Sequence, residues 1–362
     1  MELAELIGLR PVPAAGLLLT LTRRCPLSCA HCSTASTMES REEPDAGQLR
    51  RFVGSFTAED RPDVMMLTGG EPLLLPDLVS RLAGSARVSG TRTALLSGMF
   101  FARAGTVPER VMRAVAAVDH FSASLDAHHE REVPRPAVFR ALRAIREAGI
   151  PVSFHLTGTG PADPYLADVT HAIDREFDGT VPVLVNEVRA FGRAASWAGR
   201  ARTAVDTDRA LPCAMAAWPV VAFDGTVLAC CNQDVVDRRP APPHLRLGHI
   251  GADDWTTVRR RSLDSPMLRM IRTVGPSHLR ARYAPAAAPA RSYCEDCRLL
   301  ATLPEVTSGA EAVASGAVGA LLDLTAARRQ LAEGPVALAA RHGCAAYAPW
   351  LLPRQARQRA HR

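Results

Sequence analysis

The stretch "RCPLSCAHC", residues 24–32, directly follows a short apolar segment, Leu17–Thr22, that predicts a buried β-strand. Its three cysteines, Cys25, Cys29 and Cys32, are separated by three and then two residues. Three thiolates at this spacing can hold one face of a small iron–sulfur cluster and leave one iron open to another ligand. They cannot by themselves complete a structural zinc site, which takes four ligands. A zinc site that uses His31 as its fourth ligand is the alternative interpretation.

Apolar and amphipathic stretches alternate from this point over the first half of the chain. Continuous apolar strands between amphipathic helices are typical of a parallel sheet covered by helices. Six such strands predict the α/β class and a partial (β/α)6, TIM-like barrel over residues 17–195, after an N-terminal segment of residues 1–16. Further strands are expected at Val64–Thr68, Thr93–Ser97, His120–Leu125, Ile150–Thr157 and Val181–Val188, and helices at Asp45–Phe56, Asp77–Arg87, Pro108–Val118, Ala137–Ala148 and Tyr165–Phe177.

The alternation ends after Gly192, and the second half has a different organisation. Two short apolar runs, Trp218–Phe223 and Thr226–Cys230, flank an Asp-Gly pair and predict a β-hairpin. Helical patterns follow over Asp253–Thr273 and Gly309–His342. In chain order we expect a linker (196–212), a small hairpin and helix domain (213–300), a helical C-terminal extension (301–352) and a basic, disordered tail (353–362).

The composition excludes several classes of protein. All 43 Lys+Arg positions are arginine, against 37 acidic residues. Without lysine, neither a pyridoxal-phosphate or Schiff-base enzyme nor a P-loop NTPase is possible. The arginines are spread along the chain and only 5% of residues are aromatic, so no nucleic-acid partner is expected. No apolar run reaches the roughly 20 residues of a membrane helix, and no signal peptide is visible, so we expect a cytoplasmic protein whose cysteines serve as metal ligands.

A second motif, "TGGEP" at Thr68–Pro72, ends the second predicted strand about 40 residues after the cysteines. The C-x3-C-x2-C spacing together with this GGE motif resembles the radical SAM (AdoMet radical) superfamily. The resemblance implies that Cys25, Cys29 and Cys32 hold a [4Fe–4S] cluster whose open iron binds S-adenosylmethionine. It also implies one-electron cleavage of that cofactor to a 5′-deoxyadenosyl radical, which abstracts a hydrogen from the substrate.

The resemblance also assigns contacts to S-adenosylmethionine. Gly69, Gly70 and Glu71 would hold its methionine amino group. Ser124 and Asp126, in the "SLD" stretch that ends the fourth strand, are further candidates, as is Ser97 at the end of the third strand. A hydroxyl bonded only to nearby backbone is the alternative for both serines.

A second group of cysteines lies in the later half of the chain. Cys213 is followed by eleven residues, Gly225, four residues and Cys230, and a Cys-x2-Cys pair comes later. Four thiolates close a site, and their spacing alone is compatible with structural zinc or with a second [4Fe–4S] cluster. The candidate ligands are Cys213, Cys230, Cys294 and Cys297; Cys231 could replace Cys230, and Cys344 is expected to be a small core residue.

This second group resembles the SPASM/twitch region that follows some radical SAM cores. "LGHI", Leu247–Ile250, resembles the glycine-containing turn of that region. A full SPASM domain has further cysteines after its CxxC, but residues 298–341 contain none. The resemblance therefore implies the shorter twitch version with one auxiliary [4Fe–4S] cluster, which would accept an electron from the substrate radical and complete an oxidation or a C–C or C–S bond.

The sequence is compatible with two classes of substrate. The resemblance favours maturation of a ribosomally synthesised peptide, and an aminocyclitol or sugar-alcohol dehydrogenase is the alternative. Glu187 and Arg189, at the end of the sixth strand, are candidate substrate contacts or else an ion pair at the barrel rim. The first cysteine comes at residue 25, so we expect leader binding, if any, by a separate protein, and a flavodoxin or ferredoxin as electron donor.

Overall fold

A computed structural model describes residues 1–199, 209–288 and 290–360. Its central feature is a curved sheet whose first six strands are all parallel and follow one another in chain order. These strands begin and end within two residues of the predicted positions. They are β1 (Gly16–Thr20), β2 (Val64–Thr68), β3 (Arg92–Ser97), β4 (His120–Leu125), β5 (Val152–Gly158) and β6 (Val183–Glu187). The predicted α/β class with a parallel-rich sheet is confirmed.

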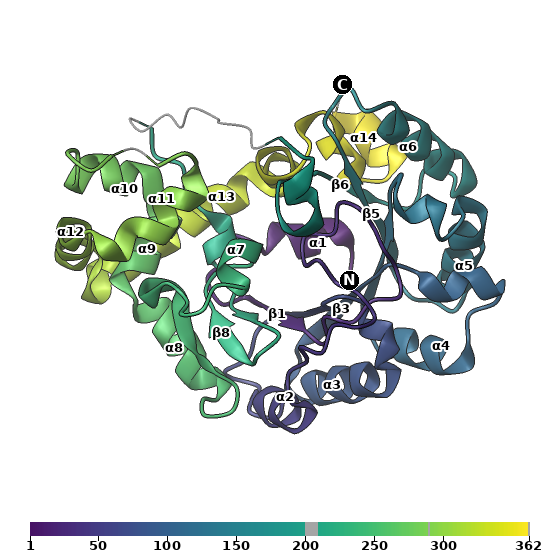
Figure 1. The fold of residues 1–362 in the computed structure, drawn as a ribbon, viewed down its shortest axis with the longest axis horizontal. Helices are drawn as coiled ribbons and strands as arrows, with labels where there is room; N and C mark the ends of the chain where they lie inside the picture. Colours follow the sequence, from purple (N-terminus) through teal and green to yellow (C-terminus); the bar gives the residue numbers. More distant parts are fainter. Residues whose placement is uncertain (200–208, 289, 361–362) are drawn as a thin grey trace.

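Five amphipathic helices cover the outer face of these strands (Figure 1). Each has a buried apolar side, as Leu82, Val115 and Leu142 illustrate. The carboxylate of Asp45 caps the first of them by accepting a hydrogen bond from the backbone N–H of Gln48. They are α2 (Ala46–Val53), α3 (Pro76–Ser89), α4 (Glu109–Ala116), α5 (Arg135–Glu147) and α6 (Pro164–Glu176).

The N-terminal segment contains a short helix, α1 (Leu3–Gly8), that lies inside the arc of strands (Figure 1). Leu3 and Leu6 are buried there in a cluster with Trp218 and Leu351. This segment therefore fills the amino-terminal end of the barrel, and the site is left at the carboxyl ends of the strands.

The predicted hairpin forms, and its strands join the sheet of the barrel. Its strands β7 (Val220–Val221) and β8 (Thr226–Leu228) extend the barrel sheet, because β7 pairs in parallel with β1. A ninth strand, β9 (Arg246–His249), pairs antiparallel with β8. The interpretation of Leu247–Ile250 as a turn is therefore wrong for its first three residues, whose extended backbone is held by pairing with β8.

Helices make up most of the remaining chain. They are α7 (Gln233–Val236), α8 (Trp255–Asp264), α9 (Pro266–Thr273), α10 (Pro276–Tyr283), α11 (Tyr293–Leu299), α12 (Pro304–Ala314) and α13 (Gly316–His342). The last of these is kinked at Gly334, which precedes a proline. In the described residues no single helix is long and apolar enough to cross a membrane, although α12 and α13 pass the same criteria as a pair bent by 91°.

Residues 354–360 of the basic tail form a helix, where the sequence analysis expected disorder. Helix α14 (Arg354–Ala360) packs near α6, where the guanidinium groups of Arg354 and Arg357 both bind the carboxylate of Asp174. These long-range ion pairs order a segment that looks like a free basic tail in sequence. Within the predicted linker, residues 200–208 lie outside the described residues.

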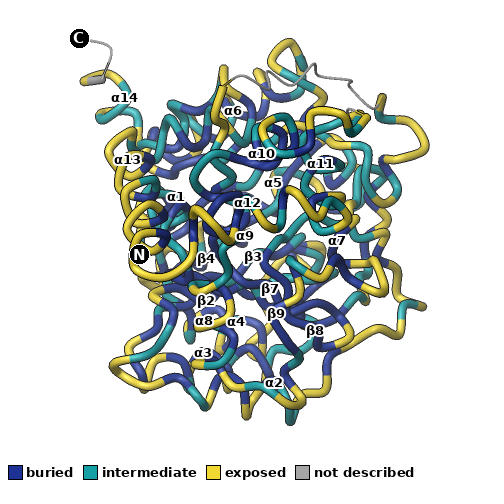
Figure 2. The backbone as a smooth tube through the Cα atoms, turned by 90° about the vertical axis from the view of Figure 1, so that its left-hand side faces the viewer, coloured by how far each residue is buried: buried dark blue, intermediate teal, exposed yellow. Residues whose placement is uncertain are grey.

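Burial follows the layers of the fold. Figure 2 shows the strands in the interior as largely buried and the outer turns of the helices as exposed. The site residues lie where strands β1 to β6 end.

Candidate functional site

The first cysteine group lies on the loop that follows β1. Cys29 is buried and Cys25 and Cys32 are half-buried, all three as free thiols. Two backbone hydrogen bonds shape the loop: Cys25 N–H donates to Thr37 O at 3.1 Å, and Cys32 N–H donates to Cys29 O at 3.1 Å. Burial raises the pKa of Cys25 to about 12. A thiol in such an environment loses its proton when a metal centre binds it.

The Gly69–Glu71 loop packs directly against the start of this cysteine loop. Gly70 N–H donates to Thr22 O at 2.6 Å, and Glu71 N–H donates to Arg24 O at 2.8 Å. A Cβ at Gly70 would lie 2.3 Å from Arg24 O, and one at Gly69 would lie 2.5 Å from Thr22 O. Both glycines are therefore required by the close approach of two backbone segments.

The Glu71 side chain is fully buried and is held in one orientation. Its carboxylate accepts hydrogen bonds from Leu73 N–H at 3.0 Å, Gly98 N–H at 2.9 Å and the Ser97 hydroxyl at 3.0 Å. Burial raises the pKa of Glu71 to about 7, against the effect of these hydrogen bonds. The structure thus joins two predicted site residues, Glu71 and Ser97, and shows that the Ser97 hydroxyl binds a side chain rather than only nearby backbone.

Asp126 is buried among histidines at the end of β4. It accepts hydrogen bonds from the backbone N–H groups of His128 and His129, at 2.8 and 3.0 Å, and its carboxylate also contacts the His129 ring and, at 3.3 Å, the His31 ring. Its carboxylate oxygens are thus already engaged by histidines. Ser124, in the same stretch, is half-buried near the end of this strand.

His129 links this carboxylate to the cysteine loop. Burial opposes a charge on the ring, but hydrogen bonds to Asp126 and Cys29 outweigh burial and raise the pKa of His129 to about 10. In the described part of the chain, His31, Asp126 and His129 are the only group of three or more His, Cys, Asp or Glu residues whose ligand atoms all lie within 4.8 Å of one another. His31 therefore faces Asp126, and the alternative zinc site of the sequence analysis would need it to face the thiols as well.

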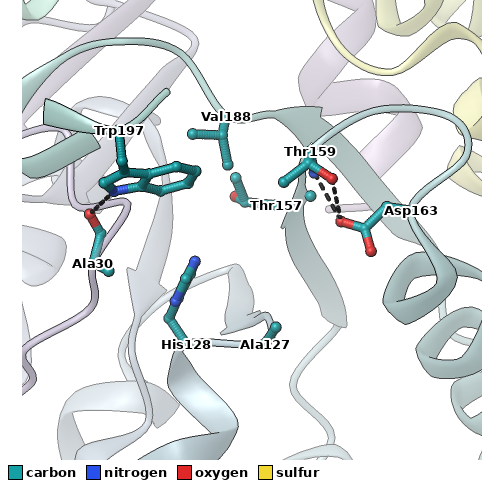
Figure 3. A pocket seen from close by; sticks show the side chains of 9 residues that line it. Ala30, Ala127, His128, Thr157, Thr159, Asp163, Val188 and Trp197 are labelled. Atoms are coloured by element: carbon teal, nitrogen blue, oxygen red, sulfur yellow. Dashed lines mark hydrogen bonds between the residues drawn. The ribbon is translucent and has the colours of Figure 1, made fainter. Parts of the chain in front are cut away.

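A cavity of about 430 Å³ opens beside the cysteine loop (Figure 3). The Trp197 indole forms one wall and donates its N–H to Ala30 O at 3.0 Å. The His128 ring lies 5.8 Å from the Trp197 ring and stacks on His31 at 5.3 Å. The lining comes from the cysteine loop and the ends of β4, β5 and β6: Ala30, Ala127, His128, Thr157, Gly158, Thr159, Asp163, Val188 and Trp197. The cavity can take a flat, partly apolar ligand next to the cysteines.

The second cysteine group converges in space from three separate segments. Burial raises the pKa of Cys213 to about 11, with further contributions from Cys294 and Cys231. Burial and the neighbouring thiols of Cys231, Cys213 and Cys297 raise the pKa of Cys230. Five thiols thus lie near one another, and the four predicted ligands are among them.

The two adjacent cysteines of this group have different partners. The thiol of Cys230 accepts a hydrogen bond from Asn232 N–H at 3.3 Å. The thiol of Cys231 accepts one from Arg10 Nη2 at 3.4 Å. No three cysteine thiols of the described residues lie within 4.8 Å of one another, whereas the sulfurs of a zinc tetrathiolate are about 3.8 Å apart.

Glu187 and Arg189 do not form the ion pair considered from sequence. Arg189 Nη2 donates to the backbone oxygen of His342 at 3.0 Å, and Glu187 hydrogen-bonds the thiol of Cys344. Arg189 thus contacts the last residue of α13, and Glu187 contacts the segment that follows this helix. Cys344 is buried, as expected for a core residue.

Three residues of the site were not identified from sequence: His129, Arg193 and Trp197. The Arg193 side chain donates to Cys29 O at 2.8 Å and to Ser36 O at 2.6 Å. The sequence "GRA", Gly192–Ala194, just after β6 is the local pattern that could have identified Arg193. No local pattern marks Trp197, whose partner Ala30 lies 167 residues earlier. The contact of His129 with Cys29 is also long-range, although its other partner, Asp126, lies only three residues before it.

Three cysteines after the first strand, a glycine-glycine-glutamate loop after the second and a cavity at the strand ends define the class of this part of the chain. Residues 19–171 match the model of the Radical SAM superfamily. The match covers about two fifths of the chain, and similarity to this superfamily over that span implies a [4Fe–4S] cluster and S-adenosylmethionine. The residues present fit these groups, since three free thiols share one loop and both His31 Nδ1 and Arg193 Nη2 are buried without a hydrogen-bond partner.

Comparison with curated proteins gives more particular similarities. The chain is 28% identical over 159 residues to the PqqA peptide cyclase of Gluconobacter oxydans, which covers 40% of this chain and 42% of that protein. It is 31% identical over 152 residues to the PqqA peptide cyclase of Streptomyces rochei, covering 39% and 40%. It is 31% identical over 173 residues to the pre-heme d1 synthase of Dinoroseobacter shibae, covering 46% and 42%. These similarities span about two fifths of the length of each relative.

The fold is also similar to a solved structure, Streptococcus suis SuiB bound to S-adenosylmethionine. The TM-score is 0.53 at 12% sequence identity, over 79% of this chain and 78% of SuiB. At this identity the similarity concerns the fold alone.

Proposed function

We propose that this chain is a radical SAM enzyme that abstracts a hydrogen from a ribosomally synthesised peptide and completes a net oxidation or a C–C or C–S bond. The observation that carries this proposal is the contact between the first cysteine loop and the buried Glu71 network, beside an open cavity. When bound, the [4Fe–4S] cluster and S-adenosylmethionine supply reductive cleavage and a carbon-centred radical for hydrogen abstraction.

In this proposal, Cys25, Cys29 and Cys32 hold the cluster. Glu71 presents a fixed carboxylate for the amino group of S-adenosylmethionine, since three hydrogen bonds already hold its orientation. A preorganised acceptor of this kind does not have to reorganise when the ligand arrives. Ser97 acts through Glu71, and Ser124 and Asp126 lie at the neighbouring strand end.

The cavity is proposed as the place of the nucleoside part of S-adenosylmethionine. Support comes from its position beside Ala30 of the cysteine loop and from its walls, the Trp197 indole and the His128 ring. Aromatic faces and a few polar groups such as Thr157 are the usual lining of a site for a flat heterocycle. The same walls would exclude water from the reacting atoms.

We further propose a twitch-type auxiliary [4Fe–4S] cluster held by Cys213, Cys230, Cys294 and Cys297. The convergence of these thiols supports it, and no three thiols in the described part of the chain lie within 4.8 Å of one another. Burial raises the pKa of Cys294, and the positive charge of Arg189, just after β6, opposes this rise. The second cysteine group therefore lies near the end of the barrel. Such a cluster could accept the electron that the substrate radical gives up, and a flavodoxin or ferredoxin would reduce the first cluster.

A peptide substrate is favoured over a small aminocyclitol or sugar alcohol by the PqqA peptide cyclases among the relatives. The test is incubation of the anaerobically reconstituted protein with S-adenosylmethionine, dithionite and a short peptide encoded beside its gene. Mass spectrometry should find the peptide without one pair of hydrogens. Turnover of an aminocyclitol, with the peptide unchanged, would contradict the peptide proposal and leave the radical SAM chemistry intact.

A further inference from the structure

The segment that follows β6 donates hydrogen bonds to backbone oxygens of the first cysteine loop. Arg193 supplies three donors: its backbone N–H binds Cys32 O at 3.0 Å, Nε binds Cys29 O at 2.8 Å and Nη1 binds Ser36 O at 2.6 Å. The Trp197 indole adds a fourth, to Ala30 O at 3.0 Å. Four carbonyl groups of the loop are thus fixed by two residues more than 150 positions later in the chain.

The preceding residue explains how Arg193 reaches this position. Gly192 has a φ of +53°, and a Cβ there would lie 2.3 Å from both Cys32 O and Ser33 O. Only glycine allows the two backbones to approach so closely. The contact therefore involves the packed backbones of both segments and does not depend on the Arg193 side chain alone.

The positive charge of Arg193 is not neutralised by an ion pair in the described part of the chain. Its three hydrogen-bond acceptors are backbone oxygens, which are neutral, and its Nη2 is buried with no hydrogen-bond partner. Together with burial, this charge lowers the pKa of His31, which lies between Cys29 and Cys32 in sequence. A fixed cation therefore stands beside the loop that would carry the first cluster.

We propose that Arg193 is a positioning residue for the first iron–sulfur cluster, whose guanidinium both holds the cysteine loop and stabilises the reduced form of the cluster. This inference rests on the proposed function. When an external donor adds one electron to the cluster, the site gains one negative charge, and a nearby fixed cation favours that state. The cluster is therefore easier to reduce than it would be without Arg193.

Four variants separate the two roles. Arg193→Gln removes the positive charge. Arg193→Lys keeps the charge but loses the planar guanidinium with its several N–H donors. Trp197→Phe keeps an aromatic ring and leaves Arg193 in place but loses the indole N–H. Arg175→Gln, on the exposed face of α6, is the matched control. For each reconstituted protein we would measure iron per chain and the midpoint potential of the electron paramagnetic resonance signal that changes when S-adenosylmethionine is added, because that signal belongs to the first cluster.

We expect Arg193→Gln to shift this potential to a more negative value and to weaken cluster retention about 10- to 100-fold, as loss of an outer-shell partner does. Arg193→Lys and Trp197→Phe should lose iron with a potential close to that of the wild type, and Arg175→Gln should match the wild type in both. An Arg193→Gln protein with wild-type iron and potential would overturn the inference.

If Arg193→Gln retains no cluster, the other two variants decide. Iron loss in both Arg193→Lys and Trp197→Phe, relative to Arg175→Gln, supports the role of Arg193, and full iron in both overturns it. A wild-type protein that binds no cluster contradicts the proposed function itself, so the two failures are distinguishable. Thermal melting of each variant before reconstitution identifies a general loss of folding.

Discussion

The hydroxyl of Ser97, at the end of β3, donates a hydrogen bond to the carboxylate of Glu71 on the loop after β2. Both residues are buried, and Gly98 N–H binds the same carboxylate. The neighbouring strand thus sets the direction of the acidic side chain of the GGE motif. In our account Glu71 receives the amino group of S-adenosylmethionine in this fixed position.

Removal of the Ser97 hydroxyl should therefore weaken cofactor binding without removing the cluster. A hydrogen bond to a charged group contributes about 1.5–3 kcal/mol, so Ser97→Ala should lower the affinity for S-adenosylmethionine roughly 10- to 100-fold. Equilibrium dialysis of the reconstituted protein measures this directly. Ser89→Ala removes a buried hydroxyl that bonds to Ala86 O of the same helix and to the Thr91 hydroxyl, and serves as the control. Equal affinities of the two variants would contradict the role of Ser97.

The two glycines of the GGE motif should be intolerant of any side chain. A Cβ at Gly70 would meet the backbone oxygen of Arg24 at 2.3 Å, and a backbone atom cannot move aside as a flexible side chain can. We expect Gly70→Ala to destabilise the protein by about 1–3 kcal/mol and to reduce iron retention. Gly84→Ala, on α3 with nothing within 4 Å, should be neutral or stabilising by roughly 0.5–1 kcal/mol. Chemical denaturation of both variants checks the contrast, and equal stability would refute it.

Loss of a cysteine from the first group should remove one cluster and all cofactor cleavage. Cys29→Ala should bind about four irons per chain, where the wild type binds about eight in two four-iron clusters. Cys344→Ala removes a buried thiol outside both groups and should keep the wild-type iron content. Iron analysis and chromatography of cofactor products provide the readouts. Normal cleavage by Cys29→Ala would exclude this cysteine as a ligand.

Loss of a cysteine from the second group should have a different effect. Cys297→Ala should still cleave S-adenosylmethionine but give no product, because the substrate radical has no electron acceptor. Cys230→Ala should behave in the same way, whereas Cys231→Ala should retain product formation, because the four-residue spacing after Gly225 favours Cys230 as the ligand. Product formation by Cys297→Ala would show that the auxiliary cluster is not the acceptor.

Much of the barrel could be predicted from sequence, because each strand is a continuous apolar run between amphipathic helices. The first cysteine group was equally accessible, since Cys25, Cys29 and Cys32 lie on one short loop. Local sequence patterns do not specify which strands pair. For that reason the pairing of β7 with β1 was not predicted. The helical tail was missed for a related reason, because Asp174, the partner of Arg354 and Arg357, lies about 180 residues earlier.

The missed site residues have the same physical explanation. Arg193 and Trp197 act on the cysteine loop across 164 and 167 residues, and no periodicity or spacing records such a contact. His129 follows Asp126 by only three residues, but its contact with Cys29 depends on how β1 and β4 end at the same edge of the sheet. Sequence therefore indicated the proposed ligands, and the three-dimensional arrangement identified the residues that contact their loop.

The most direct test of the central claim is the fate of S-adenosylmethionine on the anaerobically reconstituted wild-type protein with dithionite. Our account predicts an absorbance near 400 nm from iron–sulfur clusters and formation of 5′-deoxyadenosine and methionine, both of which should disappear in Cys25→Ala. Stoichiometric zinc without iron, and an unchanged cofactor, would contradict it.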